Sequence, residues 1–308
     1  MMPDNHAARK QPTVLIIGAG ALGRSLAALL GDHAKVTVYD RNTAVTRAMR
    51  KGWFIFKDKK RERKVKIRVI ASLAELNMAK PDILILATKI MDLRQAVEQA
   101  AGFRPRYVLF PQNGIFELAW AKKYFKTARI CRGVTSMACQ TRGYNEVTLF
   151  YRGDFYIGGD GADVIAGFFR QCGIKAKAFA DPAGPVWAKL IFSAVMNPLP
   201  VLTGKGYDVL KLDKEIWALV KKAVEEGRLV ARSLGIRLAF DPMKLILRVR
   251  HGDLAGISHK GSIAQDISAG RATELNLITG ALIREARKVG IKTPALDSIR
   301  AKARAAGA

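Results

Sequence analysis

Short, continuous apolar runs alternate with longer amphipathic stretches through the first half of the chain. Residues 13–17 (TVLII), 83–87 (ILILA) and 107–110 (YVLF) are such runs, and residues 35–40 (KVTVYD) are predicted to form a second strand that ends in an acid. Runs that are apolar at every position are typical of parallel strands buried on both faces. We therefore expect an α/β fold whose core is a doubly wound parallel sheet.

Three later segments are expected to complete this sheet. They are residues 131–138, 145–151 and 154–158, with a turn at residues 140–143 between two of them. Residues 50–68 combine an apolar run, the basic stretch KDKKRERK and alternating apolar and basic positions. That alternation predicts a hairpin with one solvated face and a basic tip.

A glycine-rich turn, GAGALG, follows the first strand directly and leads into a helical stretch. It is a GxGxxG motif in the strand–turn–helix setting that the motif requires. Gly18 permits the tight turn, Gly20 lets a pyrophosphate approach the backbone, and Gly23 lets helix and strand pack closely. The helix N-terminus then offers free N–H groups to phosphates. The motif predicts a Rossmann-type dinucleotide site.

The strand after this turn ends at Asp40 and Arg41, which bear on the identity of the cofactor. A carboxylate at this position accepts hydrogen bonds from the ribose 2′-hydroxyl of NAD, whereas a neighbouring arginine holds the 2′-phosphate of NADP. Because both are present, this strand end leaves the choice between NAD and NADP open.

The pattern changes at residues 181–185 (DPAGP), where two prolines and a glycine mark a break. Helical spacing dominates beyond it, with helices predicted over residues 186–196, 214–234, 242–249 and 273–289. We expect a Rossmann dinucleotide-binding domain over residues 1–180 and a helical substrate-binding domain over residues 181–308, with a small-molecule cleft between them.

Composition narrows the class of protein. The chain has 308 residues with 52 Lys and Arg against 26 Asp and Glu, a formal net charge of +26, and 49% hydrophobic residues. Enough apolar side chain is present to bury a core. Away from residues 50–68 the basic residues are spread through predicted helices, as on solvated faces. We expect the charge to attract an anionic cofactor and substrate rather than to bind nucleic acid.

Cysteine, histidine and apolar-run patterns exclude several other classes. Three Cys without a CxxC pair argue against a disulfide scaffold, and four scattered His argue against a metal site. The first dozen residues lack the apolar stretch of a secretory signal, and no apolar run reaches the ~18–20 residues that span a membrane. We expect a cytoplasmic protein without a metal and without a membrane partner.

Lys189 lies in WAKLIFSAV, where nearly every neighbour is apolar. Such a lysine either extends to water or presents a partly desolvated ammonium to a cleft. Burial lowers the pKa of an ammonium and makes it a useful proton donor near neutral pH. Lys189 is therefore a candidate catalytic residue.

The order and spacing of these motifs resemble those of the ketopantoate reductase (2-dehydropantoate 2-reductase) family over about residues 13–294. The shared motifs are GAGALG, ATK, PQNG, WAKL, NPL, a serine followed by QD, and a threonine–glutamate pair. The positions that carry the resemblance are Lys89, Asn113, Lys189, Asn197, Ser262 and Glu274.

The resemblance implies a fold and a reaction. The fold is a Rossmann-type sheet followed by an all-helical C-terminal domain like that of 6-phosphogluconate dehydrogenase. The reaction is the NADPH-dependent reduction of ketopantoate to pantoate, in pantothenate and coenzyme A biosynthesis. Hydride passes from the nicotinamide C4 to the keto carbon, and Lys189 gives the proton. Glu274 would be the second catalytic residue, orienting the substrate hydroxyl or the lysine.

The resemblance also assigns binding residues. The cofactor would contact Gly18, Ala19, Gly20, Ala21, Leu22, Gly23, Asp40, Arg41, Lys89, Asn113, Cys139 and Glu274. The substrate would contact Asn113, Lys189, Ser193, Asn197, Tyr207 and Ser262.

Three departures from the family pattern leave alternatives open. Ser193 stands where the family has an asparagine, Tyr207 lies in place of an asparagine–glycine–glutamate run, and Asp40 replaces a small or apolar residue. A pocket built to bond one hydroxyl pattern rejects analogues by a factor on the order of 10⁴. A related 2-keto acid reductase or D-2-hydroxyacid dehydrogenase, with another substrate and with NAD, is therefore the alternative. The amphipathic helix over residues 214–234 offers a surface for a homodimer.

Overall fold

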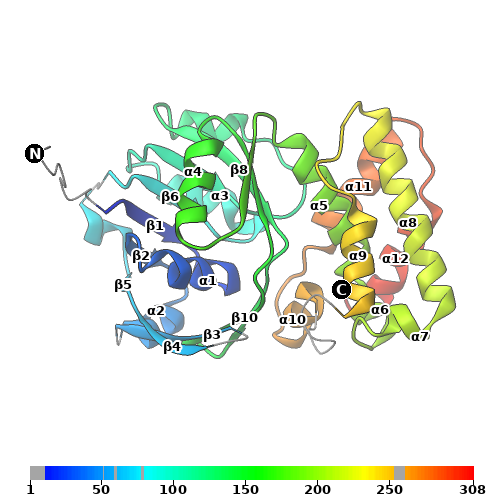
Figure 1. Cartoon of the computed structure of the whole chain (residues 1–308), viewed down its shortest axis with the longest axis horizontal. Helices are drawn as coiled ribbons and strands as arrows, with labels where there is room; N and C mark the ends of the chain where they lie inside the picture. The colour runs from blue at the N-terminus through cyan, green and yellow to red at the C-terminus, as the bar shows by residue number, and fades with distance from the viewer. Residues whose placement is uncertain (1–10, 51, 59–60, 78–79, 253–260) are drawn as a thin grey trace, which may run out of the picture.

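The computed structural model describes residues 11–50, 52–58, 61–77, 80–252 and 261–308. An eight-stranded sheet forms the centre of its N-terminal part (Figure 1). The strand order is β12-β11-β8-β7-β6-β1-β2-β5. All neighbours are parallel except β8 and β11, which are antiparallel. The strands are β1 (Thr13–Ile17), β2 (Lys35–Tyr39), β5 (Arg68–Ile70), β6 (Ile83–Leu86), β7 (Tyr107–Phe110), β8 (Arg129–Thr135), β11 (Phe155–Gly159) and β12 (Ala176–Phe179).

Helices cover both faces of this sheet, which confirms the expected doubly wound fold. Successive residues of β1 point to opposite faces, so Ile16 belongs to one hydrophobic core and Leu15 to another. The core around Ile16 includes residues of α1 and α4, and the core around Leu15 includes residues of α3. The helices of this part are α1 (Ala21–Leu30), α2 (Thr43–Met49), α3 (Ile90–Gln99) and α4 (Ala162–Gln171), with short 3₁₀ turns at Leu73–Leu76 and Ala119–Lys123.

A second, four-stranded sheet departs from the sequence prediction. Its order is β4-β3-β10-β9, with β3 (Trp53–Asp58), β4 (Glu62–Lys66), β9 (Ala138–Arg142) and β10 (Glu146–Tyr151). The hairpin predicted over residues 50–68 is confirmed for residues 53–66 by the antiparallel pairing of β3 and β4, whereas Arg68–Ile70 pair with β2 in the main sheet. Residues 59 and 60 of the predicted basic tip lie outside the described residues. Residues 145–151, however, do not complete the main sheet, and residues 140–143, predicted as a turn, lie mostly within β9.

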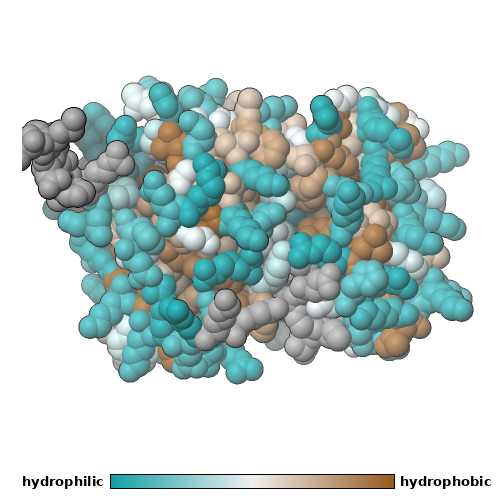
Figure 2. Space-filling model, in the orientation of Figure 1, coloured by the Kyte–Doolittle hydropathy of each residue, from teal (hydrophilic) through white to brown (hydrophobic). Residues whose placement is uncertain are grey.

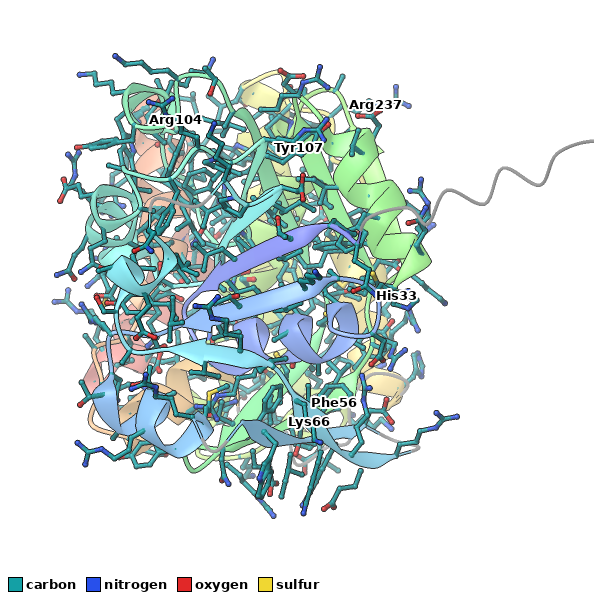
Figure 3. All side chains as sticks on the ribbon, turned by 90° about the vertical axis from the view of Figure 1, so that its left-hand side faces the viewer. His33, Phe56, Lys66, Arg104, Tyr107 and Arg237 are labelled. Atoms are coloured by element: carbon teal, nitrogen blue, oxygen red, sulfur yellow. The ribbon has the colours of Figure 1, made fainter. Side chains whose placement is uncertain are left out.

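The physical reason for this second layer is the alternation of apolar residues along its strands. Phe54, Phe56 and Val147 share a core with Leu26 of α1, so one face of the small sheet packs on that helix. Figure 3 views the edge of the main sheet, with β1 and β2 side by side and the hairpin that carries Phe56 and Lys66 below them. Phe56 is buried and Lys66 is exposed, so the outer face of the hairpin carries the positive charge.

The regular elements of the C-terminal part are all helices among its described residues, as the sequence predicts. It consists of α5 (Ala183–Met196), α6 (Leu199–Thr203), α7 (Val209–Leu212), α8 (Lys214–Ser233), α9 (Pro242–His251), α10 (Ser262–Ser268), α11 (Leu275–Lys288) and α12 (Pro294–Ala305). Helix α5 packs against α8, α9 and α11 and also against β8 and β11. It therefore joins the two parts, which lie side by side in Figure 1.

The central apolar helix is longer than the sequence pattern indicates, because helical structure resumes directly after Asn197 and Pro198. Residues Ala183–Thr203 are long and apolar enough to cross a membrane by length and composition, but 72% of the most apolar window is buried inside the protein. This stretch is therefore the core helix of the C-terminal part. Hydrophilic side chains are spread over both parts on the face that Figure 2 shows, in keeping with solvated charge.

Candidate active site

A cleft of about 560 Å³ lies between the carboxyl ends of the main-sheet strands and the helical part. It gathers most of the residues that the sequence singles out. From the N-terminal part it is lined by Ala19, Gly20, Ala21, Leu22, Asp40, Lys89, Asn113 and Cys139. From the helical part it is lined by Lys189, Asn197, Tyr207, Ser262 and Glu274. A cavity of about 380 Å³ adjoins it and adds Gly18 and Arg41.

The glycine turn has the geometry that a pyrophosphate requires. Gly18 has a φ of +106°, which L side chains rarely adopt, and a Cβ on Gly23 would lie 1.9 Å from the Gly18 carbonyl oxygen. A Cβ on Gly20 would meet no protein atom within 4 Å. Helix α1 has Gly20 as its N-cap and no side-chain cap, so its first N–H groups are left for a ligand. These residues fit a dinucleotide.

Asp40 and Arg41 have different partners. The Asp40 carboxylate accepts hydrogen bonds from the N–H groups of Ala19 (2.6 Å) and Asn42 (2.8 Å), so it braces the glycine turn. The Arg41 guanidinium lies 2.8 Å from the Asp92 carboxylate and donates to Gln95 Oε1, also at 2.8 Å. The Asp40 carboxylate is thus bound by main-chain N–H groups of Ala19 and Asn42, whereas Arg41 remains 57% exposed at the cavity.

Lys189 projects from α5 into the cleft. Its Nζ lies 4.6 Å from the centre of the Phe192 ring, and no described residue forms an ion pair with it. Desolvation lowers the pKa of Lys189 from 10.5 to about 8, while the neighbouring Cys139 acts weakly in the opposite direction. The structure therefore gives Lys189 a partly desolvated ammonium that faces the cleft.

Ser193, one turn along α5, is not at the cleft. Lys189, Phe192 and Met196 share the helix face that lines the cleft. Ser193 is 1% exposed, does not line the cleft, and its short side chain has no hydrogen-bond partner among the described residues. The predicted contact of Ser193 with the substrate does not fit this position.

Glu274 and Lys89 tie the two parts together across the cleft. Glu274 precedes α11, and its Oε1 accepts a hydrogen bond from the Ile90 N–H at 3.1 Å. Burial raises the pKa of Glu274, although the Ile90 N–H and the Lys89 ammonium act against that rise. The Nζ of Lys89 lies 2.7 Å from Asp266, which also pairs with Arg271 at 3.0 Å.

Asn197, Tyr207 and Ser262 form one polar group at the far end of the cleft. A Cβ on Gly261 would lie 2.7 Å from the Tyr207 hydroxyl and 3.2 Å from the Asn197 carbonyl oxygen, so the glycine allows their close approach. Burial raises the pKa of Tyr207, which keeps its hydroxyl protonated. Ser262 begins α10 directly after this glycine.

Cys139 lies in the cleft as a neutral thiol. Burial raises its pKa to about 11, and Lys189 only partly opposes this rise. It is therefore a small lining residue rather than a nucleophile.

Several cleft residues were not among the predicted site residues, although Gln112 and Asp266 lie within the PQNG and QD motifs. Gln112 and Arg24 line the cleft from the N-terminal part, and Asp266 and Arg271 from the helical part. Its apolar wall comprises Met137, Tyr151, Phe192, Met196, Leu245 and Val249. Arg132 lies behind the PQNG turn and had a signal comparable to that of Lys189, namely a charge inside an apolar strand (RICRGVT).

Comparison with known proteins agrees with this geometry. The family model "Ketopantoate reductase PanE/ApbA" matches residues 14–160, and "Ketopantoate reductase PanE/ApbA C terminal" matches residues 183–306. The chain belongs to the ketopantoate reductase family. As a member of that family it is an oxidoreductase.

Curated relatives span the whole ketopantoate reductase fold. The 2-dehydropantoate 2-reductase of Archaeoglobus fulgidus is 26% identical over 284 residues, which cover 90% of this chain and 92% of the relative. That of Pyrococcus horikoshii is 25% identical and covers 91% and 93%. The similarity is thus full-length but distant.

Solved structures share the same fold. A ternary structure of D-mandelate dehydrogenase with NADH and anilino(oxo)acetate has a TM-score of 0.84 at 23% identity and covers 95% of this chain and 97% of that chain. A PanE/ApbA family ketopantoate reductase from Ralstonia eutropha JMP134 has a TM-score of 0.81 at 23% identity, with the same coverage. The two-part architecture is therefore that of the family.

Proposed function

We propose that this chain reduces a 2-keto acid to the corresponding 2-hydroxy acid with a nicotinamide dinucleotide, and that ketopantoate is the substrate and NADPH the donor. The observation that carries the proposal is the half-buried ammonium of Lys189, which faces a cleft shared with an uncapped glycine turn. The curated 2-dehydropantoate 2-reductases support the choice of substrate.

A nicotinamide dinucleotide held at the glycine turn would supply the hydride for the keto carbon. Lys189 Nζ donates a hydrogen bond to the keto oxygen and gives up its proton as that oxygen becomes an alkoxide. The ammonium stabilises charge that develops mainly in the transition state. Glu274, which lines the same cleft, orients the lysine or the substrate hydroxyl.

The remaining cleft residues bind and enclose the substrate in this proposal. Asn113, Asn197, Tyr207 and Ser262 hydrogen-bond its polar groups. The apolar wall excludes water from the reacting carbon, which strengthens the electrostatic contacts inside. The sheet-containing residues 1–180 would bind the dinucleotide and residues 181–308 would supply most of the substrate contacts.

The second candidate is a D-2-hydroxyacid dehydrogenase for a 2-keto acid with a bulky apolar side chain. Tyr207, Phe192 and Leu245 form much of an aromatic and aliphatic wall that a large side chain would cover. The D-mandelate dehydrogenase structure, with its bound aromatic anilino(oxo)acetate, supports this alternative.

One kinetic experiment separates the two candidates. The loss of NADPH or NADH absorbance is followed with ketopantoate, 2-ketoisovalerate and phenylglyoxylate. We expect the highest kcat/KM with ketopantoate and NADPH. A preference for phenylglyoxylate assigns the second candidate, and a chain that turns over no 2-keto acid with either donor refutes both.

The rate of reduction is expected to fall as the pH rises through about 8. Desolvation lowers the pKa of Lys189 to about 8, so the ammonium is protonated below that pH and loses its proton above it. The kcat/KM for reduction should be constant below pH about 8 and decline above it, while oxidation of the 2-hydroxy acid should rise through the same range. A profile of both directions checks this. A break only near the ordinary lysine value of 10.5 would contradict the desolvated site.

Arg41 is expected to carry the preference for NADPH. Its guanidinium is exposed at the cavity, whereas the Asp40 carboxylate is bound by the main-chain N–H groups of Ala19 and Asn42. Because hydrogen bonds to charged groups contribute about 1.5–3 kcal/mol, Arg41→Ala should weaken NADPH binding about 10- to 100-fold with little effect on NADH. Fluorescence titration with both cofactors measures this.

Two further variants make the cofactor experiment specific. Arg47→Ala removes an exposed arginine of α2 and should leave both affinities unchanged. Asp40→Ser removes a negative charge beside the predicted 2′-phosphate position and should raise the ratio of NADPH to NADH affinity. An unchanged ratio in Arg41→Ala would remove NADPH from the proposal.

A homodimer and a cytoplasmic location stay predictions. A ketopantoate reductase from Staphylococcus aureus is described as dimeric. Leu212 and Leu229, on α7 and α8, are exposed and offer apolar contact area for a second copy. Light scattering of the purified chain measures its oligomeric state.

A further inference from the structure

Arg132 lies in the middle of β8, directly behind the PQNG turn. It is 5% exposed. Its Nη1 donates to the carbonyl oxygens of Phe110 (3.0 Å) and Gln112 (2.7 Å), and its Nη2 donates to that of Gly114 (2.7 Å). The guanidinium also lies 3.8 Å from the centre of the Phe116 ring. One buried side chain thus holds residues 110–116 at four points.

This cation has no carboxylate partner among the described residues, and burial lowers its pKa to about 9. It stays mainly protonated at neutral pH. Buried charges are costly, and well-packed apolar residues commonly replace them without loss of stability. A contribution to fold stability therefore does not account for a buried arginine at this position. Its role concerns the PQNG turn that it binds.

The bonds of Arg132 fix the direction in which the turn faces. A trans peptide has its C=O and N–H on opposite sides. Because the Gln112 carbonyl is bound to Arg132 behind the turn, the Asn113 N–H of the same peptide faces the other way. Gln112 and Asn113 both line the cleft, whereas Arg132 does not. No described residue accepts a hydrogen bond from the Asn113 N–H.

Further contacts connect the PQNG turn to the end of β6 and to helix α11 of the helical part. The Gln112 side chain donates to the Thr88 carbonyl at 3.1 Å and also to that of Leu86, so the turn is tied to the end of β6. Gly114 has a φ of +84°, and a Cβ there would lie 2.9 Å from Ile90 Cδ1 and 3.0 Å from the Leu277 carbonyl oxygen. The turn therefore touches α11, which begins just after Glu274.

The position of the turn along the sheet indicates which end of a dinucleotide it faces. The adenosine half of a Rossmann ligand lies at the end of the second strand of the motif, here at Asp40. The other half extends past β6 to β7, and Asn113 follows β7. The amide group of a nicotinamide carries a carbonyl oxygen, which needs an N–H donor.

We propose that Arg132 is a positioning residue that presents the Asn113 N–H and side chain to the nicotinamide end of the bound dinucleotide. This inference rests on the proposed function only in that it requires a nicotinamide dinucleotide in the cleft. It does not depend on which 2-keto acid is reduced or on the role of Lys189.

The test compares two ligands that differ only at the nicotinamide end. Calorimetry measures the Kd of oxidised NADP and of 2′-phospho-ADP-ribose, which lacks the nicotinamide, for wild type, Arg132→Met and Arg132→Lys. We expect Arg132→Met to weaken NADP binding about tenfold or more and to leave the fragment within about twofold. Arg132→Lys, which keeps the charge but loses the planar fork, should lie between. If the cofactor is NAD, then NAD and ADP-ribose form the pair.

Controls separate positioning from a general loss of structure. Arg129→Met removes an exposed arginine of the same strand, paired with Asp160 at 3.8 Å, and should change neither Kd. Thermal unfolding identifies variants that do not fold, and the Arg132→Lys comparison then carries the test. Parallel weakening of both ligands, or no weakening of either, would overturn the proposal. A wild type that binds the fragment but no dinucleotide would refute the inference, and one that binds neither would refute the proposed function as well.

Discussion

Lys189→Ala is expected to lower kcat for 2-keto acid reduction by about 10²- to 10⁴-fold, the contribution typical of a positioned general acid. The reason is that Lys89, the other lysine that lines the cleft, is paired with the Asp266 carboxylate, whereas Lys189 has no ion-pair partner among the described residues. Dinucleotide affinity should stay within about twofold of wild type, since the glycine turn and Asp40 lie on the other part of the protein. Stopped-flow turnover and fluorescence titration on the same samples measure both quantities.

Stability provides a second readout for the same variant. Desolvation of Lys189 costs free energy in the folded state, so Lys189→Met should unfold at the same temperature as wild type or higher. Lys205→Ala, an exposed lysine outside the cleft, serves as the matched control. Substantial turnover by Lys189→Ala would assign the proton to another group and remove the mechanism. A lower unfolding temperature in Lys189→Met would mean that the lysine stabilises the fold.

The centre of the main sheet could be predicted because β1, β6 and β7 are apolar at almost every position. Residues 13–17, 83–86 and 107–110 have no polar face, so only a layer covered on both sides accommodates them. The small sheet could not be assigned in the same way. The alternation at Phe54, Phe56 and Val147 indicates that one face of these strands is buried, but it does not indicate which element covers that face. In the structure, helix α1 covers it.

Site residues could be predicted where a polar side chain directly follows a predicted strand. Lys89 and Asn113 follow strands at the carboxyl edge of the sheet, where parallel strands place ligand-binding residues, and both line the cleft. Ser193 shows the limit of motif spacing. It is one helical turn from Lys189, yet the helix turns its short side chain into the packing of the C-terminal part. The role of Arg132 depends on three carbonyl groups whose directions only the folded turn defines.

Alanine substitutions at Gly23 and Gly20 are expected to separate folding from ligand binding at the glycine turn. A Cβ on Gly23 would lie 1.9 Å from the Gly18 carbonyl oxygen, a main-chain atom of the tight turn between β1 and α1. Helix and turn must move apart to relieve this contact, and overpacking of this kind costs about 1–3 kcal/mol or more. Gly23→Ala should therefore lower Tm by several degrees and abolish measurable dinucleotide binding.

Gly20→Ala is the matched opposite case. Its Cβ meets no protein atom within 4 Å, and the residue has no positive φ, so Tm should stay within about one degree of wild type. The same methyl group would occupy the space over the α1 N-terminus that a pyrophosphate needs, and the Kd for the dinucleotide should rise about tenfold or more. Differential scanning calorimetry and titration with the dinucleotide measure the pair. If Gly20→Ala binds the dinucleotide as tightly as wild type, the pyrophosphate does not lie over this turn, because the added methyl group would lie in the space assigned to the pyrophosphate.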